Sequence, residues 1–215
     1  MRLYLDCADR AELAPLLDTG LFSGVTTNPL ILQRGGVRLA EVPALVHWLL
    51  ERGTAEVFVQ TTAADADRIV AEGRELRALS DRVVVKIPAT TAGLTAARRL
   101  ADQGVPVLVT AVYHALQALT ALAAGARWIA PYVGRMTEQG RDGHEQVAQM
   151  QRILTGSSTG VLAASLRSAE DVRRLALLGV EAVTVGAPVA RALLTEPLTE
   201  AAVADFDRAV AQLRD

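Results

Sequence analysis

The residue that points most directly to chemistry is Lys86, within the run Val83-Val-Val-Lys-Ile-Pro88. It is the one lysine among 22 basic residues, so this chain uses arginine wherever it needs a surface cation. Burial in an apolar run disfavours a charged amine, and a neutral amine attacks carbonyl groups. The sequence therefore predicts Schiff-base chemistry at Lys86. The alternative is a structural lysine that pairs with an inward carboxylate such as Asp6.

Polar side chains stand at or near the ends of seven short apolar runs. They are Asp6, Asn28, Gln60, Lys86, Thr110, Tyr132 and Ser165. We expect Asp6 to shuttle a proton, and Tyr132 to exchange one or to orient a water with Gln60 and Thr110. Two structural alternatives stay open at this stage: Asp6 as the N-cap of the next helix, and Tyr132 as a packed aromatic with a solvated hydroxyl.

A phosphate site is expected beside these residues. Arg135 lies in a stretch that begins with Gly134, while Ser165 and Arg167 come just before a helix start at Ser168. Arginines and a helix N-terminus suit a phosphate dianion, although either arginine alone is also typical of a solvated surface. The three histidines lack the spacing of metal ligands, so we predict no metal ion.

Eight apolar runs must position these side chains, each followed by a helical segment. The runs cover residues 3–6, 24–28, 57–60, 83–87, 107–110, 128–132, 161–165 and 182–186. Most are too continuously apolar to alternate, which is typical of parallel strands covered on both faces. Eight strands alternating with helices in about 210 residues predict a (β/α)8 TIM barrel, an α/β fold whose active site lies at the carboxyl ends of the strands. No glycine-rich nucleotide loop follows the first run, which disfavours a doubly wound sheet.

The helical segments carry apolar stripes at steps of three and four, at residues 39–50, 69–79 and 172–178. Thr62-x-x-Asp65 and Ser168-x-x-Asp171 match the capping box that starts a helix. Gly104, Gly125 and Gly179 stand where helices should end. An additional amphipathic helix is expected at residues 199–213. With no linker or repeat in the sequence, we expect residues 1–215 to form one domain.

Composition excludes several classes of protein. A net charge of −2 argues against a nucleic-acid-binding surface. The single cysteine, Cys7, forms no internal disulfide, and Asp6 and Asp9 interrupt any export signal, so we expect a cytoplasmic protein. Residues 103–126 carry no formal charge, but polar side chains and Pro106 interrupt them, which favours a buried strand and a helix over a membrane span.

These motifs together resemble the small transaldolase family, and within it the fructose-6-phosphate aldolase-like branch. The resemblance runs through Leu3-Tyr-Leu-Asp6, Gly24-Val-Thr-Thr-Asn-Pro29, Val84-Val-Lys-Ile-Pro88, Thr110-Ala-Val-Tyr113, Ala130-Pro-Tyr-Val-Gly-Arg135 and Ala163-Ala-Ser165. It covers nearly the whole chain. It implies a (β/α)8 barrel without cofactor or metal, sugar-phosphate or hydroxyketone and aldehyde substrates, and a homo-oligomer, a pentamer or decamer.

The resemblance also implies a role for each matching residue. Lys86 would form the Schiff base, Asp6 would be the catalytic carboxylate, and Tyr132 would transfer a proton. Gln60 and Thr110 would hold the catalytic water. Thr27 and Asn28 would lie at the substrate, with Asn28 contacting the dihydroxyacetone unit. Arg135, Ser165 and Arg167 would face the phosphate.

The two branches of the family differ at several positions, and this chain carries residues typical of each branch. Gln60, Tyr113 and Tyr132 resemble the aldolase branch, whereas Val133-Gly-Arg135 and Arg141-Asp-Gly143 resemble transaldolases. We therefore predict a Schiff-base aldolase acting on the C3–C4 bond of a ketose phosphate such as fructose 6-phosphate. The alternative is a transaldolase that transfers a dihydroxyacetone unit between sugar phosphates. A non-catalytic sugar-phosphate-binding barrel is a more distant alternative, and a barrel isomerase lacks its expected glutamate or histidine base.

Overall fold

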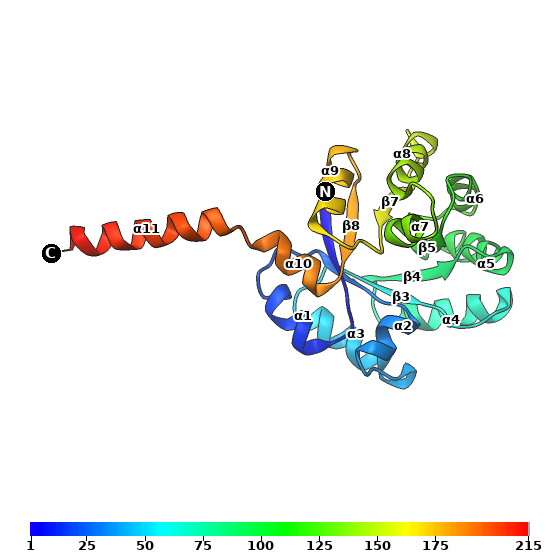
Figure 1. Cartoon of the computed structure of the whole chain (residues 1–215). Coiled ribbons are helices and arrows are strands. Elements are labelled where there is room, and N and C mark those ends of the chain that lie inside the picture. The colour runs from blue at the N-terminus through cyan, green and yellow to red at the C-terminus, as the bar shows by residue number, and fades with distance from the viewer. Residues whose placement is uncertain (215) are drawn as a thin grey trace.

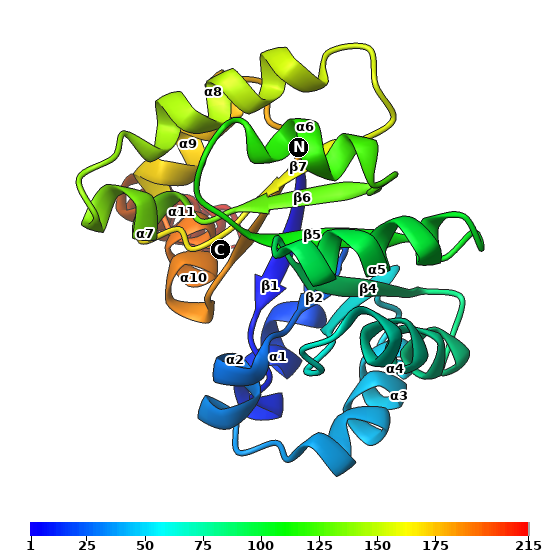
Figure 2. The same cartoon turned by 90° about the vertical axis from the view of Figure 1, so that its right-hand side faces the viewer.

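Eight parallel strands close into a barrel in the computed structural model, which describes residues 1–214 (Figures 1 and 2). The strands pair in chain order, and β8 closes on β1. They are β1 (Arg2–Asp6), β2 (Gly24–Thr26), β3 (Glu56–Gln60), β4 (Val83–Pro88), β5 (Val107–Val112), β6 (Trp128–Pro131), β7 (Gly160–Ala163) and β8 (Ala182–Val185). Each lies on one of the eight predicted runs. The predicted (β/α)8 TIM barrel is therefore confirmed.

Helices follow the strands and cover the outside of the barrel (Figure 2). They are α1 (Arg10–Leu17), α2 (Pro29–Arg34), a 3-10 turn η1 (Leu39–Glu41), α3 (Val42–Glu51), α4 (Ala66–Ala78), α5 (Thr91–Ala101), α6 (Gln117–Ala123), α7 (Val133–Glu138), α8 (Gly143–Leu154), α9 (Ala169–Leu177), α10 (Ala187–Leu194) and α11 (Pro197–Leu213). The three predicted apolar stripes fall on α3 with η1, on α4 and on α9.

The helix-start signals are confirmed at one of two positions. Ser168 and Asp171 form the predicted capping box at α9. At α4 the prediction was wrong, because Asp65 itself is the N-cap and accepts from the amide of Arg68. The amide and hydroxyl of Thr62, which precedes α4, instead donate to Glu72 in the middle of that helix. Glu72 therefore takes both Thr62 donors, including the amide that the predicted capping box would have paired with Asp65.

Two apolar layers hold the barrel together. The larger lies between the strands and the surrounding helices, and the smaller fills the barrel interior. The inner layer includes Tyr4, Phe58, Val84, Leu108 and Trp128, all buried. Because successive side chains of a strand alternate between its two faces, Lys86 points into the barrel like Val84 two residues before it. The alternation of side chains along β4 therefore places the amine inside the barrel, nearer than this layer to the carboxyl ends of the strands.

The last helix, α11, extends away from the barrel (Figure 1). None of its described residues is buried, although Leu198, Val203, Phe206 and Val210 carry large apolar side chains. The uncharged stretch 103–126 folds as β5 and α6, as expected. Within residues 1–214, no helix combines the length and the apolar character needed to cross a bilayer.

Candidate active site

Lys86 lies near the end of β4 with only 2% of its surface exposed. Its Nζ donates a hydrogen bond to the backbone carbonyl of Thr27 at 3.0 Å. Among the residues that the structure describes, no carboxylate lies within ion-pairing distance of this amine. The alternative of a structural ion pair with Asp6 is therefore wrong. A buried amine that only a carbonyl holds can release that contact when a substrate carbonyl approaches.

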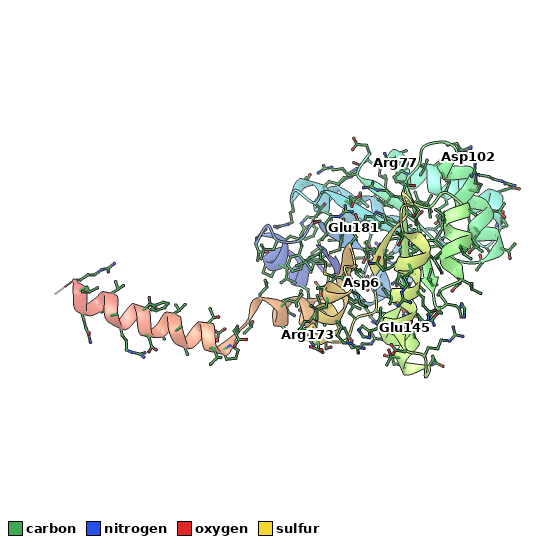
Figure 3. All side chains as sticks on the ribbon, turned by 90° about the horizontal axis from the view of Figure 1, so that it is seen from above. Asp6, Arg77, Asp102, Glu145, Arg173 and Glu181 are labelled. Carbon is green, nitrogen blue, oxygen red and sulfur yellow. The ribbon has the colours of Figure 1, made fainter. Side chains whose placement is uncertain are left out.

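Asp6 ends β1 and belongs to a short chain of hydrogen bonds across three strands. Its Oδ1 accepts from the hydroxyl of Thr26 at 2.5 Å, and that hydroxyl lies 2.7 Å from the hydroxyl of Thr184 on β8. The N-cap of α1 is Asp9, so the alternative role of Asp6 as a helix cap is wrong. Figure 3 shows Asp6 toward the middle of the barrel, whereas Asp102 lies at its periphery. The carboxylate is thus oriented from one side and free to meet a substrate on the other.

Thr27 and Asn28 follow β2, and the side chain of each already makes a hydrogen bond to the backbone. The hydroxyl of Thr27 donates to the carbonyl of Phe58 at 3.0 Å, which turns its own carbonyl to Lys86. Asn28 is the N-cap of α2, and its Oδ1 accepts from the amide of Ile31. The carboxamide of Asn28 therefore keeps its NH2 group as a donor. Thr27 contributes through its backbone, and Asn28 is the member of this pair that lines the cavity.

Tyr132, directly after β6, lies beside Thr110 on β5, with their hydroxyl oxygens 3.0 Å apart. Tyr132 is buried, so the alternative of a solvated hydroxyl at the barrel rim is wrong. The Arg135 guanidinium lies over the ring of Tyr132 at 4.8 Å, and Tyr113 packs edge-on against the same ring. Arg135 also donates to the Tyr113 hydroxyl at 3.4 Å, which raises the pKa of the guanidinium. Three side chains thereby fix the phenol of Tyr132.

The backbone is irregular at Ala111, the residue directly after Thr110. Ala111 has φ +56°, and the pairing of β5 with β6 shifts register between Val109 and Val112. A left-handed alanine costs about 1 kcal/mol and persists only where the surroundings impose it. The bulge turns the end of β5 at Thr110, next to Tyr132.

Ser165 and Arg167 lie after β7, beside Arg135 on α7. Ser165 also has a left-handed backbone, at φ +61°. Its Oγ is buried and makes no hydrogen bond with any described residue. Arg167 pairs with Glu138 at 2.8 Å, and this contact lowers the pKa of the Glu138 carboxyl. A buried hydroxyl without a partner, between two arginines, suits an anionic ligand.

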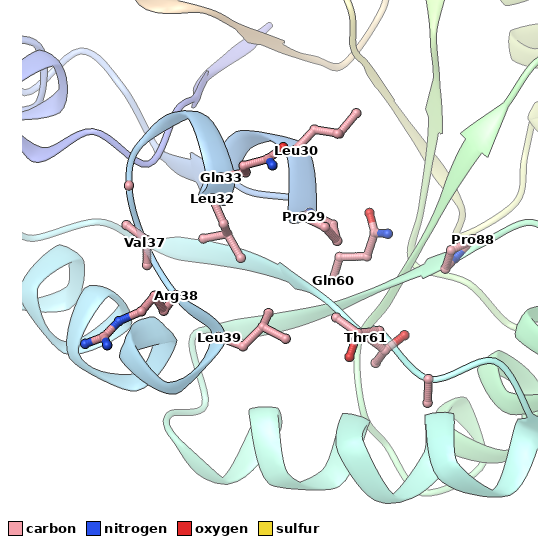
Figure 4. Close-up of a pocket in the computed structure, with 13 residues that line it drawn as sticks. Pro29, Leu30, Leu32, Gln33, Val37, Arg38, Leu39, Gln60, Thr61 and Pro88 are labelled. Atoms are coloured by element: carbon pink, nitrogen blue, oxygen red, sulfur yellow. The ribbon is translucent and has the colours of Figure 1, made fainter.

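A cavity of about 60 Å³ brings most of the predicted residues together. Seven of the ten line it: Asp6, Asn28, Lys86, Tyr132, Arg135, Ser165 and Arg167. Thr27 and Thr110 lie directly behind Lys86 and Tyr132. Gln60 instead lines a neighbouring cavity of about 820 Å³, where its side chain rises between Pro29 and Pro88 (Figure 4). Leu30 lines both cavities and forms the boundary between them.

Three further residues of the site were not predicted from the sequence. Thr26 and Thr184 orient Asp6, and Arg34 lines the cavity from the last turn of α2. The two threonines were visible as polar residues inside apolar strands, at positions where a strand of this fold normally carries valine or isoleucine. Arg34 gave no signal, because one exposed arginine among 21 looks like surface.

The model described as Transaldolase/Fructose-6-phosphate aldolase matches residues 3–215. The chain belongs to this family. It is therefore an enzyme of the aldolase and transaldolase kind, as the Schiff-base prediction required.

Two curated relatives match this family member over nearly the whole of both chains. A probable transaldolase of Hyphomonas neptunium is 38% identical over 96% of this chain and 95% of its own length. A probable transaldolase of Phenylobacterium zucineum is 36% identical, over 96% and 94%.

Solved structures at lower identity show the shared barrel alone. A structure titled "Native KDPGal structure" matches 86% of this chain and 81% of its own, with a TM-score of 0.60 and 17% identity. A mandelate oxidase variant matches with a TM-score of 0.59 and 20% identity, and this chain spans 66% of it.

Proposed function

We propose that this enzyme transfers a dihydroxyacetone unit from a ketose phosphate to an aldehyde acceptor, the transaldolase reaction, through a Schiff base on Lys86. The observation that carries the proposal is the buried amine of Lys86, held by a carbonyl and facing a cavity with Asp6, Asn28 and Tyr132. The relatives at 36–38% identity, all named probable transaldolases, favour transfer over simple cleavage.

The reaction begins when the neutral amine of Lys86 attacks the C2 carbonyl of the ketose. Loss of water gives an imine, whose protonated form accepts electrons from the neighbouring bond. Asp6 removes the proton of the C4 hydroxyl, the C3–C4 bond breaks, and the aldehyde product leaves. The remaining enamine attacks the carbonyl carbon of the acceptor aldehyde and forms a new C–C bond, while Asp6 returns its proton to the carbonyl oxygen of the acceptor. Water then hydrolyses the imine and frees the amine.

Binding of the substrate uses the two sides of the cavity. The free NH2 group of Asn28 donates to a hydroxyl of the dihydroxyacetone unit. At the other side, Ser165, Arg135 and Arg167 bind the phosphate, and a phosphate oxygen accepts from the otherwise unpaired hydroxyl of Ser165. A phosphate dianion between two arginines forms charge-assisted hydrogen bonds, which are about twice as strong as neutral ones.

The second candidate is a fructose-6-phosphate aldolase, and a specific contact favours it. The phenol of Tyr132 shares a hydrogen bond with the hydroxyl of Thr110 inside the site. A phenol held there can protonate the enamine before an acceptor arrives, and the reaction then ends as cleavage. Gln60 cannot act as a base, so it leaves proton transfer to Tyr132 and Asp6. The balance between cleavage and transfer therefore depends on how well Tyr132 reaches the enamine carbon.

Borohydride trapping tests the chemistry common to both candidates. Reduction in the presence of fructose 6-phosphate should fix a covalent adduct, and peptide mass analysis should place it on Lys86. An adduct at another residue, or none, would remove the mechanism. Adding erythrose 4-phosphate then separates the candidates: without this acceptor a transaldolase releases at most one equivalent of glyceraldehyde 3-phosphate per active site, whereas an aldolase releases it over many turnovers.

The exposed apolar side chains of α11 also require a partner, and we propose a second copy of this chain. A 17-residue helix without a buried residue gains little stability by itself, because isolated helices of this length are marginal in water. The pentamer or decamer, the single domain over residues 1–215 and the cytoplasmic location stay predictions from the sequence.

A further inference from the structure

The loop from Ser165 to Ser168 carries two of the proposed phosphate ligands and is held by one carboxylate. Oδ2 of Asp171 accepts from the amides of Arg167 and Ser168, at 3.0 and 3.1 Å, and from the Ser168 hydroxyl at 3.1 Å. All three donors belong to the loop. The position of Asp171 therefore sets where the loop lies.

His144 stands behind Asp171, near the start of α8. It is buried, and its Nε2 lies 3.4 Å from Oδ1 of Asp171, the oxygen that the loop leaves free. No described residue forms a regular hydrogen bond with this nitrogen. His144 thus faces the one group that organises the loop, and it contributes nothing to the catalytic cavity itself.

The packing around His144 leaves little freedom for this arrangement. A Cβ at Gly143 would lie 2.5 Å from the carbonyl oxygen of Val133, and one at Gly134 would lie 2.3 Å from the carbonyl oxygen of Ser165. The amide of Gly134 also donates to that Ser165 carbonyl at 2.9 Å. The start of α8, the start of α7 and the loop therefore touch through backbone, and a shift of one moves the others.

We propose that His144 is a positioning residue for the phosphate side of the active site. Through Asp171 it fixes the loop so that the hydroxyl of Ser165 and the guanidinium of Arg167 meet the substrate phosphate. The inference rests on the proposed function, because it concerns the affinity of that site for phosphorylated substrates. It predicts that His144 affects the binding of the phosphate and leaves the chemistry at Lys86 unchanged.

The test compares a phosphorylated with a non-phosphorylated ligand in two variants. His144→Phe keeps the ring volume and removes the contact with Asp171, and His144→Gln keeps a side-chain donor. In His144→Phe we expect the KM for fructose 6-phosphate to rise about tenfold, because Asp171 loses the side chain that fixes its position, with kcat within about twofold. In His144→Gln the rise should stay below about threefold. Dihydroxyacetone, which has no phosphate, should be trapped on Lys86 at the wild-type concentration dependence in both.

His47→Gln, at an exposed position on α3, is the matched control and should leave every value unchanged. An unchanged KM for fructose 6-phosphate in His144→Phe would overturn the role of His144. An equal shift in dihydroxyacetone trapping would do the same, since it would indicate general damage. If His144→Phe does not fold, His144→Leu, which also lacks a polar side-chain atom, provides the same comparison with the same expected result. Failure of the wild-type enzyme to trap dihydroxyacetone would instead refute the Schiff-base function.

Discussion

Replacing Glu56 should separate stability from activity, because this carboxylate lies at the opposite end of the barrel from the proposed site. Glu56 begins β3, and Gln60, which ends it, lies about 13 Å further along at the rise of a parallel strand. Oε2 of Glu56 accepts from the Tyr4 hydroxyl at 2.6 Å, and its carboxylate pairs with Arg127 at 2.8 Å and Arg2 at 3.6 Å. Burial and this carboxylate raise the pKa of Tyr4, which keeps the phenol protonated as a donor.

The cost of Glu56→Ala follows from what each partner loses. Tyr4 is fully buried, so its hydroxyl loses its acceptor and gains no water, which costs about 1–3 kcal/mol. The side chains of Arg2 and Arg127 are 39% and 47% exposed, so water replaces the carboxylate and each pair contributes only about 0–1 kcal/mol. The three losses sum to about 1–5 kcal/mol of unfolding free energy, and a chain of this size loses roughly 2–4 °C of Tm per kcal/mol.

Thermal unfolding at one protein concentration measures this loss, with two matched variants beside it. Glu56→Gln keeps an acceptor for Tyr4 and should cost about 1 kcal/mol. Glu181→Ala removes the exposed partner of Arg2 and should cost at most about 0.5 kcal/mol. The kcat/KM of Glu56→Ala, measured well below its Tm, should stay within about twofold of wild type. Equal losses for Glu56→Ala and Glu181→Ala, or a fall in kcat/KM in the still-folded Glu56→Ala protein, would refute this reasoning.

Four further changes test the site and the last helix. Lys86→Arg should abolish borohydride trapping, because a guanidinium is a poor nucleophile, and should lower Tm, because it buries a larger and permanently charged group; a trapped adduct in this variant would contradict the proposal. Tyr132→Phe should reduce acceptor-independent cleavage about a hundredfold and reduce transfer much less, as measured by glyceraldehyde 3-phosphate release with and without acceptor. Ala111→Val should lower Tm, because a β-branched residue resists φ +56°, whereas Ala111→Gly should keep Tm and lower kcat by loosening Thr110. Deleting residues 197–215 should reduce the molar mass in solution, measured by light scattering, and an unchanged mass would exclude α11 from the interface.

The sequence by itself determined the strands and the residues that are candidates for the chemistry. Continuous apolar runs are a local signal, and eight of them in alternation with helical stripes fit only one closed parallel arrangement. The period of two within Val83–Pro88 puts Lys86 on the same face as Val84, and the closed barrel shows that this face is the inner one. The lysine stood out because arginine filled every other basic position.

Only the tertiary structure decided which partners these side chains have. From the sequence, Asp6 could equally have capped α1 or paired with Lys86. Its carboxylate instead accepts from Thr26, because β2 and β8 lie on either side of β1. His144 and Asp171 are 27 positions apart on different helices, so no local pattern links them. A sequence records the preferences of each residue for its neighbours along the chain, whereas hydrogen bonds and ion pairs depend on distances that closing the barrel creates. For that reason the elements could be predicted, and the contacts that orient the site could not.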